Sequence, residues 1–215
     1  VLEPVALGYR YVVPSPARTG VRNLLRNLNS PVVFANDVLQ GSPSKAGVTI
    51  ARFGVNTTIG VAGIFDVADH FGLKRRNEDF GQTLGVWGVG EGPYLFIPVL
   101  GPNNVRDAFG RVVDFAFDPL NYANYDGDTA VSVSRGVLSG LDAREQLIDP
   151  VRDIKAQSAD PYATMKRIYT ANRRDEVKDG AVDVQALPDF DANPESAQAP
   201  VAAGAAPSAG TGTPQ

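Results

Sequence analysis

The sequence contains no cysteine, and among its 215 residues it has only one histidine, one methionine and one tryptophan. The absence of cysteine excludes a disulfide framework, a cysteine-ligated metal site and a thiol nucleophile. Because His70 is the only imidazole, a site with two histidine ligands is excluded, and a histidine-based triad would need this residue. Phosphate-binding loops, serine-hydrolase elbows and zinc-protease helices are also missing. We therefore expect neither an enzyme nor a resident metal or cofactor.

Positive and negative charges nearly balance over most of the chain. The sequence has 20 basic and 24 acidic residues, a net charge of -4, but five of the acids lie beyond Lys178, which is the last basic residue. The first 60 residues hold six basic residues and two acids. This local bias favours contact with an anionic surface or headgroup over the broad basic face of a DNA-binding domain. Basic residues are not interleaved with aromatic ones, so no nucleic-acid partner is expected.

Long hydrophobic runs are absent, since no segment reaches the ~18 uninterrupted apolar residues of a spanning helix. The chain is instead rich in glycine and proline, with 22 and 16 residues. Three Ser-Pro steps, at 15–16, 30–31 and 42–43, predict three short helices. In each, the serine hydroxyl would cap the helix and the proline would occupy its first turn.

The first of these helices is clearly amphipathic. Its polar side carries a row of three arginines, Arg18, Arg22 and Arg26, and its apolar side carries Ala17, Val21, Leu24, Leu25 and Leu28. The pattern fits an interfacial helix at a membrane surface, and it also fits an ordinary surface helix packed on a core.

Further helices are predicted downstream. Their approximate ranges are 32–40 with Gly41 as the C-cap, a helix from 44 onward, 105–117, 129–148, and a last helix from 161. Asp-Pro pairs should end the helices at 118–119 and 149–150, and Asp160-Pro161 should begin the last one. The helix over 105–117 has a polar side, formed by Arg106, Asp107, Arg111 and Asp114. Convincing alternating strands are missing, so an all-α fold is expected.

Residues 78–102 are the most unusual part of the sequence. Glu78 and Asp79 are adjacent, which indicates a solvated turn. Glycines then alternate at Gly88, Gly90 and Gly92, and the apolar run 94–100 contains a proline. Glycine and proline both oppose a helix across 88–102, so a hinged loop leading into an extended apolar segment is predicted.

The composition changes after about residue 181. Residues 186–215 hold nine alanines and five prolines, with one aromatic residue and no basic one. Such a segment buries too little apolar area to offset the entropy of ordering it. We therefore predict a helical domain over 1–178 and a disordered tail over 179–215.

A long combined motif covers residues 77–107. It reads Asn77 to Gly85, then Gly88-Val89-Gly90-Glu91-Gly92-Pro93-Tyr94-Leu95, then Pro98 to Pro102, and then Arg106-Asp107. This string resembles the VacJ/MlaA family, and the likeness extends over roughly residues 3–175. The lipobox cysteine that usually precedes this part of the family's sequence is not in the chain, so we expect a processed or truncated N-terminus.

The resemblance implies a ring of short amphipathic helices in the inner leaflet of the Gram-negative outer membrane. Family members of this kind pass misplaced phospholipids from the outer leaflet through an amphipathic pore toward the periplasm. The implied partners are phospholipid, a trimeric porin of the outer membrane and a periplasmic lipid-carrier protein. A non-transporting scaffold that anchors a porin or envelope complex is the alternative. A lipid hydrolase would need a base for Ser132, Ser134 or Ser139, and none is visible.

The resemblance also suggests candidate residues. A gate would be hinged at four glycines, Gly85, Gly88, Gly90 and Gly92. The lipid path would be bordered by Phe80, Leu84, Trp87, Tyr94, Phe96, Arg106 and Asp107. The arginine row at 18, 22 and 26 would face lipid phosphates or periplasmic solvent, although plain core packing remains an equal explanation for the aromatic residues.

Overall fold

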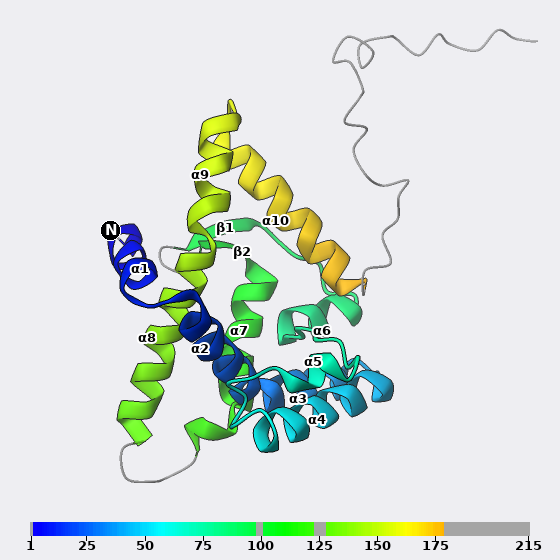
Figure 1. The fold of residues 1–215 in the computed structure, drawn as a ribbon. Helices are drawn as coiled ribbons and strands as arrows, with labels where there is room; N and C mark the ends of the chain where they lie inside the picture. The colour runs from blue at the N-terminus through cyan, green and yellow to red at the C-terminus, as the bar shows by residue number, and fades with distance from the viewer. Residues whose placement is uncertain (1, 98–100, 123–127, 179–215) are drawn as a thin grey trace, which may run out of the picture. The chain divides into compact units, whose positions relative to one another are not determined.

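The computed structural model describes residues 2–97, 101–122 and 128–178, which all belong to the first of the two units of the chain, residues 1–181. The predicted tail over 179–215 lies outside the described residues. Most of the described residues are helical (Figure 1). The α-helices are α1 (Leu2–Val12), α2 (Ser15–Leu28), α3 (Ser30–Leu39), α4 (Pro43–Thr58), α5 (Val67–His70), α6 (Phe80–Val86), α7 (Val105–Phe117), α8 (Asp128–Gln146), α9 (Ile148–Gln157) and α10 (Pro161–Val177).

The remaining regular elements are small. A short 3-10 helix spans Pro119–Asn121, and strands β1 (Tyr94–Ile97) and β2 (Gly101–Asn104) pair antiparallel, with Tyr94 opposite Asn104. The extended segment after the glycines is thus confirmed. Its pairing into a hairpin was not predicted, because β2 has the sequence Gly-Pro-Asn-Asn, which lacks any alternation of apolar residues.

Helix starts agree with the Ser-Pro steps, but the predicted capping is wrong. Neither Ser15, Ser30 nor Ser42 accepts a hydrogen bond at the start of α2, α3 or α4. The hydroxyl of Ser30 instead donates to the carbonyl of Arg26, over 3.4 Å. Only Asn29 separates α2 from α3, so Ser30 is already helical, and proline alone then favours the helix start.

Acidic and amide residues cap the later helices. The side chain of Asp160 accepts from the backbone N–H of Ala163 over 3.0 Å, as predicted for the last helix. Asn104 caps α7 in the same manner, accepting from Asp107 over 2.7 Å. The predicted stop at Asp149-Pro150 is wrong, because α9 begins at Ile148 and Pro150 lies in its first turn, where proline is tolerated.

The prediction of a solvated turn at residues 78 and 79 is also wrong. Glu78 is buried and its carboxylate lies 3.3 Å from the ammonium of Lys45. Asp79 caps α6 through the N–H of Gln82 and pairs with Arg173 of α10 over 2.8 Å. Tertiary partners from distant segments, which the local sequence does not reveal, bury Glu78 and partly cover Asp79.

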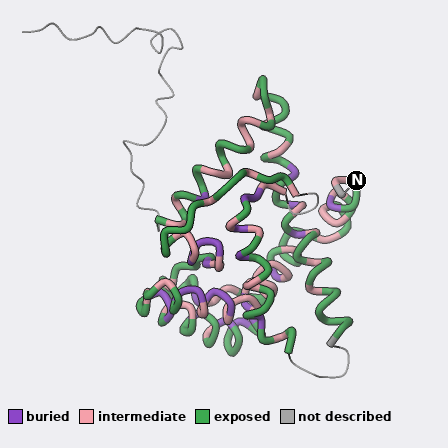
Figure 2. The backbone as a smooth tube through the Cα atoms, turned by 180° about the vertical axis from the view of Figure 1, so that it is seen from behind, coloured by how far each residue is buried: buried purple, intermediate pink, exposed green. Residues whose placement is uncertain are grey.

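The interior is unusually polar. Among the described residues, the fully buried hydrophobic side chains are few and mostly small: Ala6, Val32, Val33, Ala46, Ala68 and Ile148. Buried polar residues are more numerous, and Figure 2 shows that buried stretches are short and interrupted. A soluble domain of this size normally buries its larger hydrophobic side chains. Here hydrogen bonds and ion pairs provide many of the interior contacts instead.

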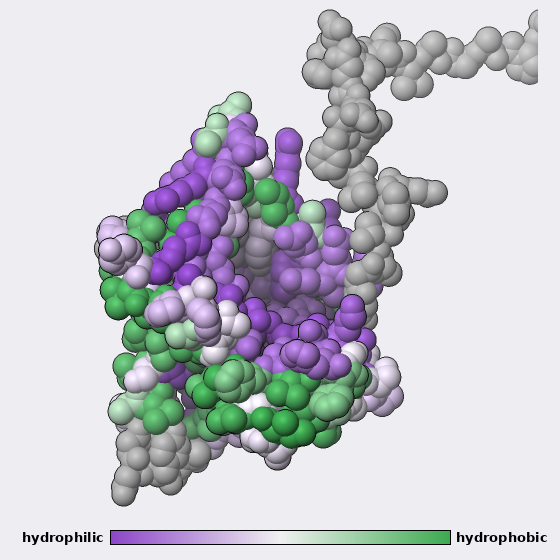
Figure 3. Space-filling model, viewed as in Figure 1, coloured by the Kyte–Doolittle hydropathy of each residue, from purple (hydrophilic) through white to green (hydrophobic). Residues whose placement is uncertain are grey.

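Helix α7 shows this inversion most clearly. Its polar Asp107 is 3% exposed, whereas its apolar Phe109, Val112 and Phe115 are 57%, 68% and 69% exposed. Helix α4 follows the same rule, because Lys45, Arg52 and Asn56 are buried while Ile50 is exposed. Figure 3 shows a hydrophobic band over the α3–α4 region below a hydrophilic hollow. Exposed apolar area of this extent marks contact with a membrane or a partner.

Ion pairs attach the N-terminal helices to α8 and α9. The guanidinium of Arg22 contacts Asp142 over 2.9 Å, and that of Arg10 contacts Glu145 over 2.8 Å. Arg18 also pairs with Glu145. These contacts fix α2 along one side of the hollow, and α8 lies behind it (Figure 1). None of the described helices is long and apolar enough to cross a membrane.

Candidate functional site

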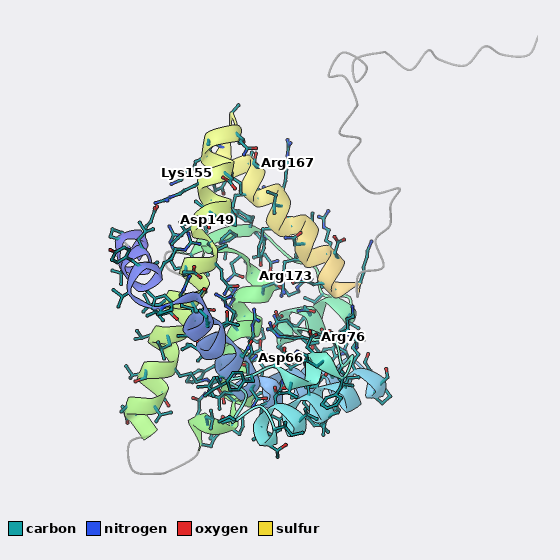
Figure 4. All side chains as sticks on the ribbon, viewed as in Figure 1. Asp66, Arg76, Asp149, Lys155, Arg167 and Arg173 are labelled. Atoms are coloured by element: carbon teal, nitrogen blue, oxygen red, sulfur yellow. The ribbon has the colours of Figure 1, made fainter. Side chains whose placement is uncertain are left out.

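A cavity of about 590 Å³ lies among α2, α3, α4, α8 and the segment that connects α5 to α6. Its wall contains amide and hydroxyl side chains, such as Asn29, Ser30 and Asn77, together with a high density of charged residues. In Figure 4 the label Arg76 marks the connecting segment, and Asp66 lies just before α5.

Cations dominate this wall. They come from α2, α4 and the connecting segment, and they are Arg22, Arg26, Lys45, Arg52, Lys74, Arg75 and Arg76. Only two acidic residues line the same wall, Asp66 and Asp142. We call these seven basic residues the cationic cluster.

Three members of the cationic cluster have acidic partners. Arg22 contacts Asp142 over 2.9 Å, and Arg52 contacts Asp66 over 2.7 Å. Lys45 lies 3.3 Å from Glu78. Each lining carboxylate is therefore already engaged: the amide of Asn56 also donates to Asp66, over 3.0 Å, and that of Gln146 donates to Asp142, over 2.7 Å.

The other four members, Arg26, Lys74, Arg75 and Arg76, make no ion pair with any residue in the described part of the chain. Burial lowers the pKa of the Arg26 guanidinium, and the neighbouring charge of Arg22 lowers it further. Arg75 lines the cavity and is exposed to solvent, yet surrounding protein and the like charges of Arg26 and Arg52 lower its pKa to about 10. An anion in the cavity would relieve this repulsion.

A second hollow of about 780 Å³ runs along the opposite side of α2. Its wall is largely apolar and includes Ala17, Val21 and Leu24 of α2, which face Ile64 and Phe65. The cationic cavity and this apolar groove share Asn23 and Asp66 in their walls. The two sides of the amphipathic helix α2 thus border two adjacent hollows of opposite character.

The seven residues predicted to border a lipid path lie elsewhere. Phe80 stacks edge-on against Trp87 and Phe117, at ring distances of 5.9 and 5.8 Å, and the indole N–H of Trp87 donates to the carbonyl of Leu39 over 3.1 Å. Leu84 lies half-buried on α6. Since neither these nor the other predicted path residues line the cationic cavity, their role in a lipid path stays a prediction.

The remaining path residues fall into two groups. Tyr94 packs edge-on against Tyr162 and Tyr169 of α10, whereas Phe96 is 55% exposed on β1. Arg106 and Asp107 belong to a buried network: Arg106 donates to Asp107 over 3.0 Å.

Asp107 is the centre of that network. Its carboxylate also accepts from the hydroxyl of Tyr169 and the guanidinium of Arg173, both over 2.7 Å. Although burial opposes ionisation, hydrogen bonds and charge from Arg173 and Tyr169 lower the pKa of Asp107 to about 2. This ionised carboxylate joins α7 to α10, and Figure 4 shows Arg173 reaching inward from α10.

The four candidate gate glycines are not equivalent. Gly85 lies inside α6, where a Cβ would come within 2.8 Å of Val177, so close packing with α10 requires it. Gly88 and Gly92 adopt left-handed φ values of +88° and +67°, which disfavour any other residue. Gly88 and Gly90 have open space where a Cβ would point.

The arginine row is divided in a similar way. Arg18 and Arg22 are engaged with acids of α8, whereas Arg26 faces the cavity without an acidic partner among the described residues. Sequence reasoning missed Lys45, Arg52 and residues 74–76 as members of a site. The run Lys-Arg-Arg at 74–76 was a visible signal, but its proximity to α2 depends on tertiary structure.

Comparison with known proteins identifies the family that has this architecture. Residues 1–176 match the family model described as MlaA lipoprotein. The chain belongs to the MlaA family. The intermembrane phospholipid transport system lipoprotein MlaA of Escherichia coli (strain K12) is 37% identical over 172 residues, covering 79% of the chain and 66% of that relative. The protein of the same name from Haemophilus influenzae is 34% identical over 193 residues, and the match covers 88% of the chain and 76% of that relative.

A solved structure of similar fold supports the family assignment. It was determined in work described as the structural basis for maintenance of bacterial outer membrane lipid asymmetry. It superimposes with a TM-score of 0.70 at 33% identity, and the match covers 82% of this chain and 88% of that one. The chain thus spans about two thirds of the length of the E. coli MlaA relative and most of this MlaA-like structure.

Proposed function

We propose that this chain passes misplaced phospholipids from the outer leaflet of a Gram-negative outer membrane to a periplasmic carrier protein. It would thereby help to maintain lipid asymmetry, working in the inner leaflet with its open side toward the periplasm and beside a trimeric porin. The names of the MlaA relatives and of the similar structure support a role in phospholipid transport. In this proposal the protein binds and releases lipid without changing it covalently.

One observation carries the proposal: a cationic cavity and an apolar groove border the two sides of α2. A phospholipid has a phosphate that needs cationic or hydrogen-bonding partners and acyl chains that need apolar surface. In our proposal the headgroup occupies the cavity while a chain follows the groove. Asn23 lies in the walls of both the cavity and the groove, and its amide donates to the carbonyl of Ile64 over 3.2 Å.

The inverted helices support the location in a membrane. The exposed face of α7 and the hydrophobic band over α3 and α4 would contact acyl chains, while polar side chains face inward. Proteins in lipid direct their polar residues toward the interior or toward water-filled cavities. We further propose that the loop at residues 88–92 opens and closes the lipid path, because its left-handed glycines give it a conformation that other residues resist.

Obstruction of the cavity tests the proposal. Ala143 lies on α8 in the cavity wall, so Ala143→Trp should fill the space. We expect this variant, expressed in a strain that lacks its own family member, to leave phospholipid exposed at the cell surface and to carry less co-purified phospholipid. Ser132→Trp, on an exposed position of the same helix outside both hollows, is the matched control.

The outcomes separate two functions. The transport function is supported if Ala143→Trp fails to restore lipid asymmetry and carries less phospholipid, while Ser132→Trp behaves like the wild-type protein in both assays. If both variants restore the barrier fully and the wild-type protein carries no phospholipid, the transport proposal is wrong and a porin-anchoring scaffold explains the protein.

A further inference from the structure

We infer that the cationic cavity selects phospholipids whose headgroup has a net negative charge and ends in hydroxyl groups, such as phosphatidylglycerol, over zwitterionic lipids that end in an ammonium. This inference rests on the proposed function, because it names the lipid class that the same cavity takes.

The first argument is the charge that remains after internal pairing. Arg22, Lys45 and Arg52 are balanced by acids within the protein. The other four members of the cationic cluster, Arg26 and residues 74–76, are not paired with any described acid. One phosphate would balance only part of this charge. A headgroup that adds its own ammonium balances still less, because its net charge is zero.

The second argument concerns where an ammonium would lie. A zwitterionic headgroup needs a carboxylate for its ammonium, and the lining carboxylates are Asp66 and Asp142. Arg52 and Asn56 already bind Asp66, and Arg22 and Gln146 already bind Asp142. An ammonium placed in this cavity would therefore meet guanidinium groups, and like charges at close range repel.

The third argument is the neutral part of the wall. Asn29, Ser30 and Asn77 line the same cavity, and amide and hydroxyl groups donate and accept hydrogen bonds with alcohols. A glycerol headgroup presents hydroxyls that these side chains can bind without any change of charge. The wall thus offers partners for both the phosphate and the polyol of an anionic headgroup.

Short-chain lipids that dissolve as monomers provide the test. The dissociation constants of dihexanoyl-phosphatidylglycerol, dihexanoyl-phosphatidylethanolamine and inorganic phosphate are measured by calorimetry on the full chain in a non-ionic detergent at low salt. We expect the glycerol lipid to bind about tenfold more tightly than the ethanolamine lipid. This ratio should fall as salt is added, because ions screen the exposed cations.

Matched variants locate the selectivity. Arg75→Gln with Arg76→Gln removes two charges from the cavity wall, and the ratio should then fall to about twofold. Lys155→Gln with Arg167→Gln removes two charges outside the cavity, from exposed positions on α9 and α10, and Figure 4 shows Arg167 projecting away from its helix. This control should keep the wild-type ratio.

Several results would overturn the inference. Equal binding of the two lipids by the wild-type protein refutes charge selection but leaves lipid transport standing. An equal loss in the control variant assigns the effect to overall charge rather than to the cavity. Phosphate that binds as tightly as the glycerol lipid makes this a site for free phosphate. If neither lipid binds, the proposed function fails together with the inference.

Discussion

Replacement of Arg173 by methionine should test how far buried ion pairs, rather than an apolar core, hold the helices together. Arg173 is 8% exposed, and its guanidinium contacts Asp107 of α7 over 2.7 Å and Asp79 at the start of α6 over 2.8 Å. Methionine keeps most of the side-chain volume, but it leaves Asp79 without its cation and leaves Asp107 with Arg106 alone, over 3.0 Å. Removal of one partner of a buried pair typically costs about 3–5 kcal/mol of unfolding free energy.

The pKa of Asp107 supports the lower end of that range. Its fall from 3.8 to about 2 on folding corresponds to stabilisation of roughly 2–3 kcal/mol at neutral pH. Because the folded-state pKa is depressed, this stabilisation is complete above the unfolded pKa and is lost as the pH falls toward 2. In the Arg173→Met variant, burial without Arg173 raises the pKa of the Asp107 carboxyl. Protonation of Asp107 at mildly acidic pH should therefore restore part of the lost unfolding free energy.

Urea unfolding followed by circular dichroism, at pH 7 and at pH 4 in a mild detergent, measures both effects. We expect a loss of about 3–4 kcal/mol at pH 7 and a clearly smaller loss at pH 4. Arg174→Met is the matched control, since the neighbouring Arg174 is 65% exposed at its side chain and pairs only with Glu91 among the described residues. Exposed pairs contribute about 0–1 kcal/mol. Equal losses in the two variants, or a loss at position 173 that does not change with pH, would refute the reasoning.

Three further predictions concern single positions. Gly63→Ala should lower the unfolding free energy by about 2–3 kcal/mol, because Gly63 has φ +94° and a Cβ would lie 2.3 Å from that of Asn27; Gly54→Ala, where space is open, should be neutral or stabilising by up to about 1 kcal/mol in the same urea titration. Burial raises the pKa of the Asp114 carboxyl to about 6, although hydrogen bonds from Asn36 and Phe80 lower it. The carboxyl carbon resonance of Asp114 should therefore titrate with a midpoint near 6, and a midpoint below 4.5 contradicts this account. Because the raised folded-state pKa makes the ionised form unfavourable, Asp114 should stabilise the fold progressively as the pH falls from about 6 toward 4. Gly88→Pro cannot keep φ +88° and should disturb outer-membrane lipid asymmetry in a complementation assay, as should Gly90→Pro; wild-type behaviour of both variants would rule out the gate.

Local signals predicted the helices well and their capping poorly. The bounds of α7 agree with its periodicity, because Asp118-Pro119 ends the helix where predicted. The Ser-Pro steps located three helix starts for a correct reason, the fixed φ of proline, and an incorrect one, the serine hydroxyl. Pro150 was read as a stop because the sequence does not show that a new helix starts two residues earlier.

Periodicity could not predict which side of a helix faces inward. The alternation in α7 was evident, but the same pattern describes a helix with a buried apolar side and one with a buried polar side. Asp107 and Asp114 turn inward because Asn36, Tyr169 and Arg173 meet them there. Those partners come from α3 and α10, so only the tertiary structure decides the orientation.

The candidate site was predictable in part. The arginine row and its apolar counterpart on α2 pointed to an amphipathic surface, and both sides of α2 do line hollows. The other cations come from α4 and from residues 74–76, which lie about 20 to 50 positions from the row in the sequence. Nothing in a local pattern reports that α4 and the connecting segment fold back beside α2.

The ion pairs of α1 and α2 carry a consequence for how the chain acquires its fold. Arg10 and Arg22 find their acids 139 and 120 residues later, at Asp149 and Asp142. During synthesis from the N-terminus, these guanidinium groups have no native partner until nearly the whole helical region exists. Contacts of such long sequence separation slow folding and leave intermediates exposed to aggregation. A chain truncated before α8 should therefore leave α1 undocked and the guanidinium of Arg22 without its acid, while α2 still contacts α3 and α4. Binding to a chaperone during that interval would protect the apolar side of α1.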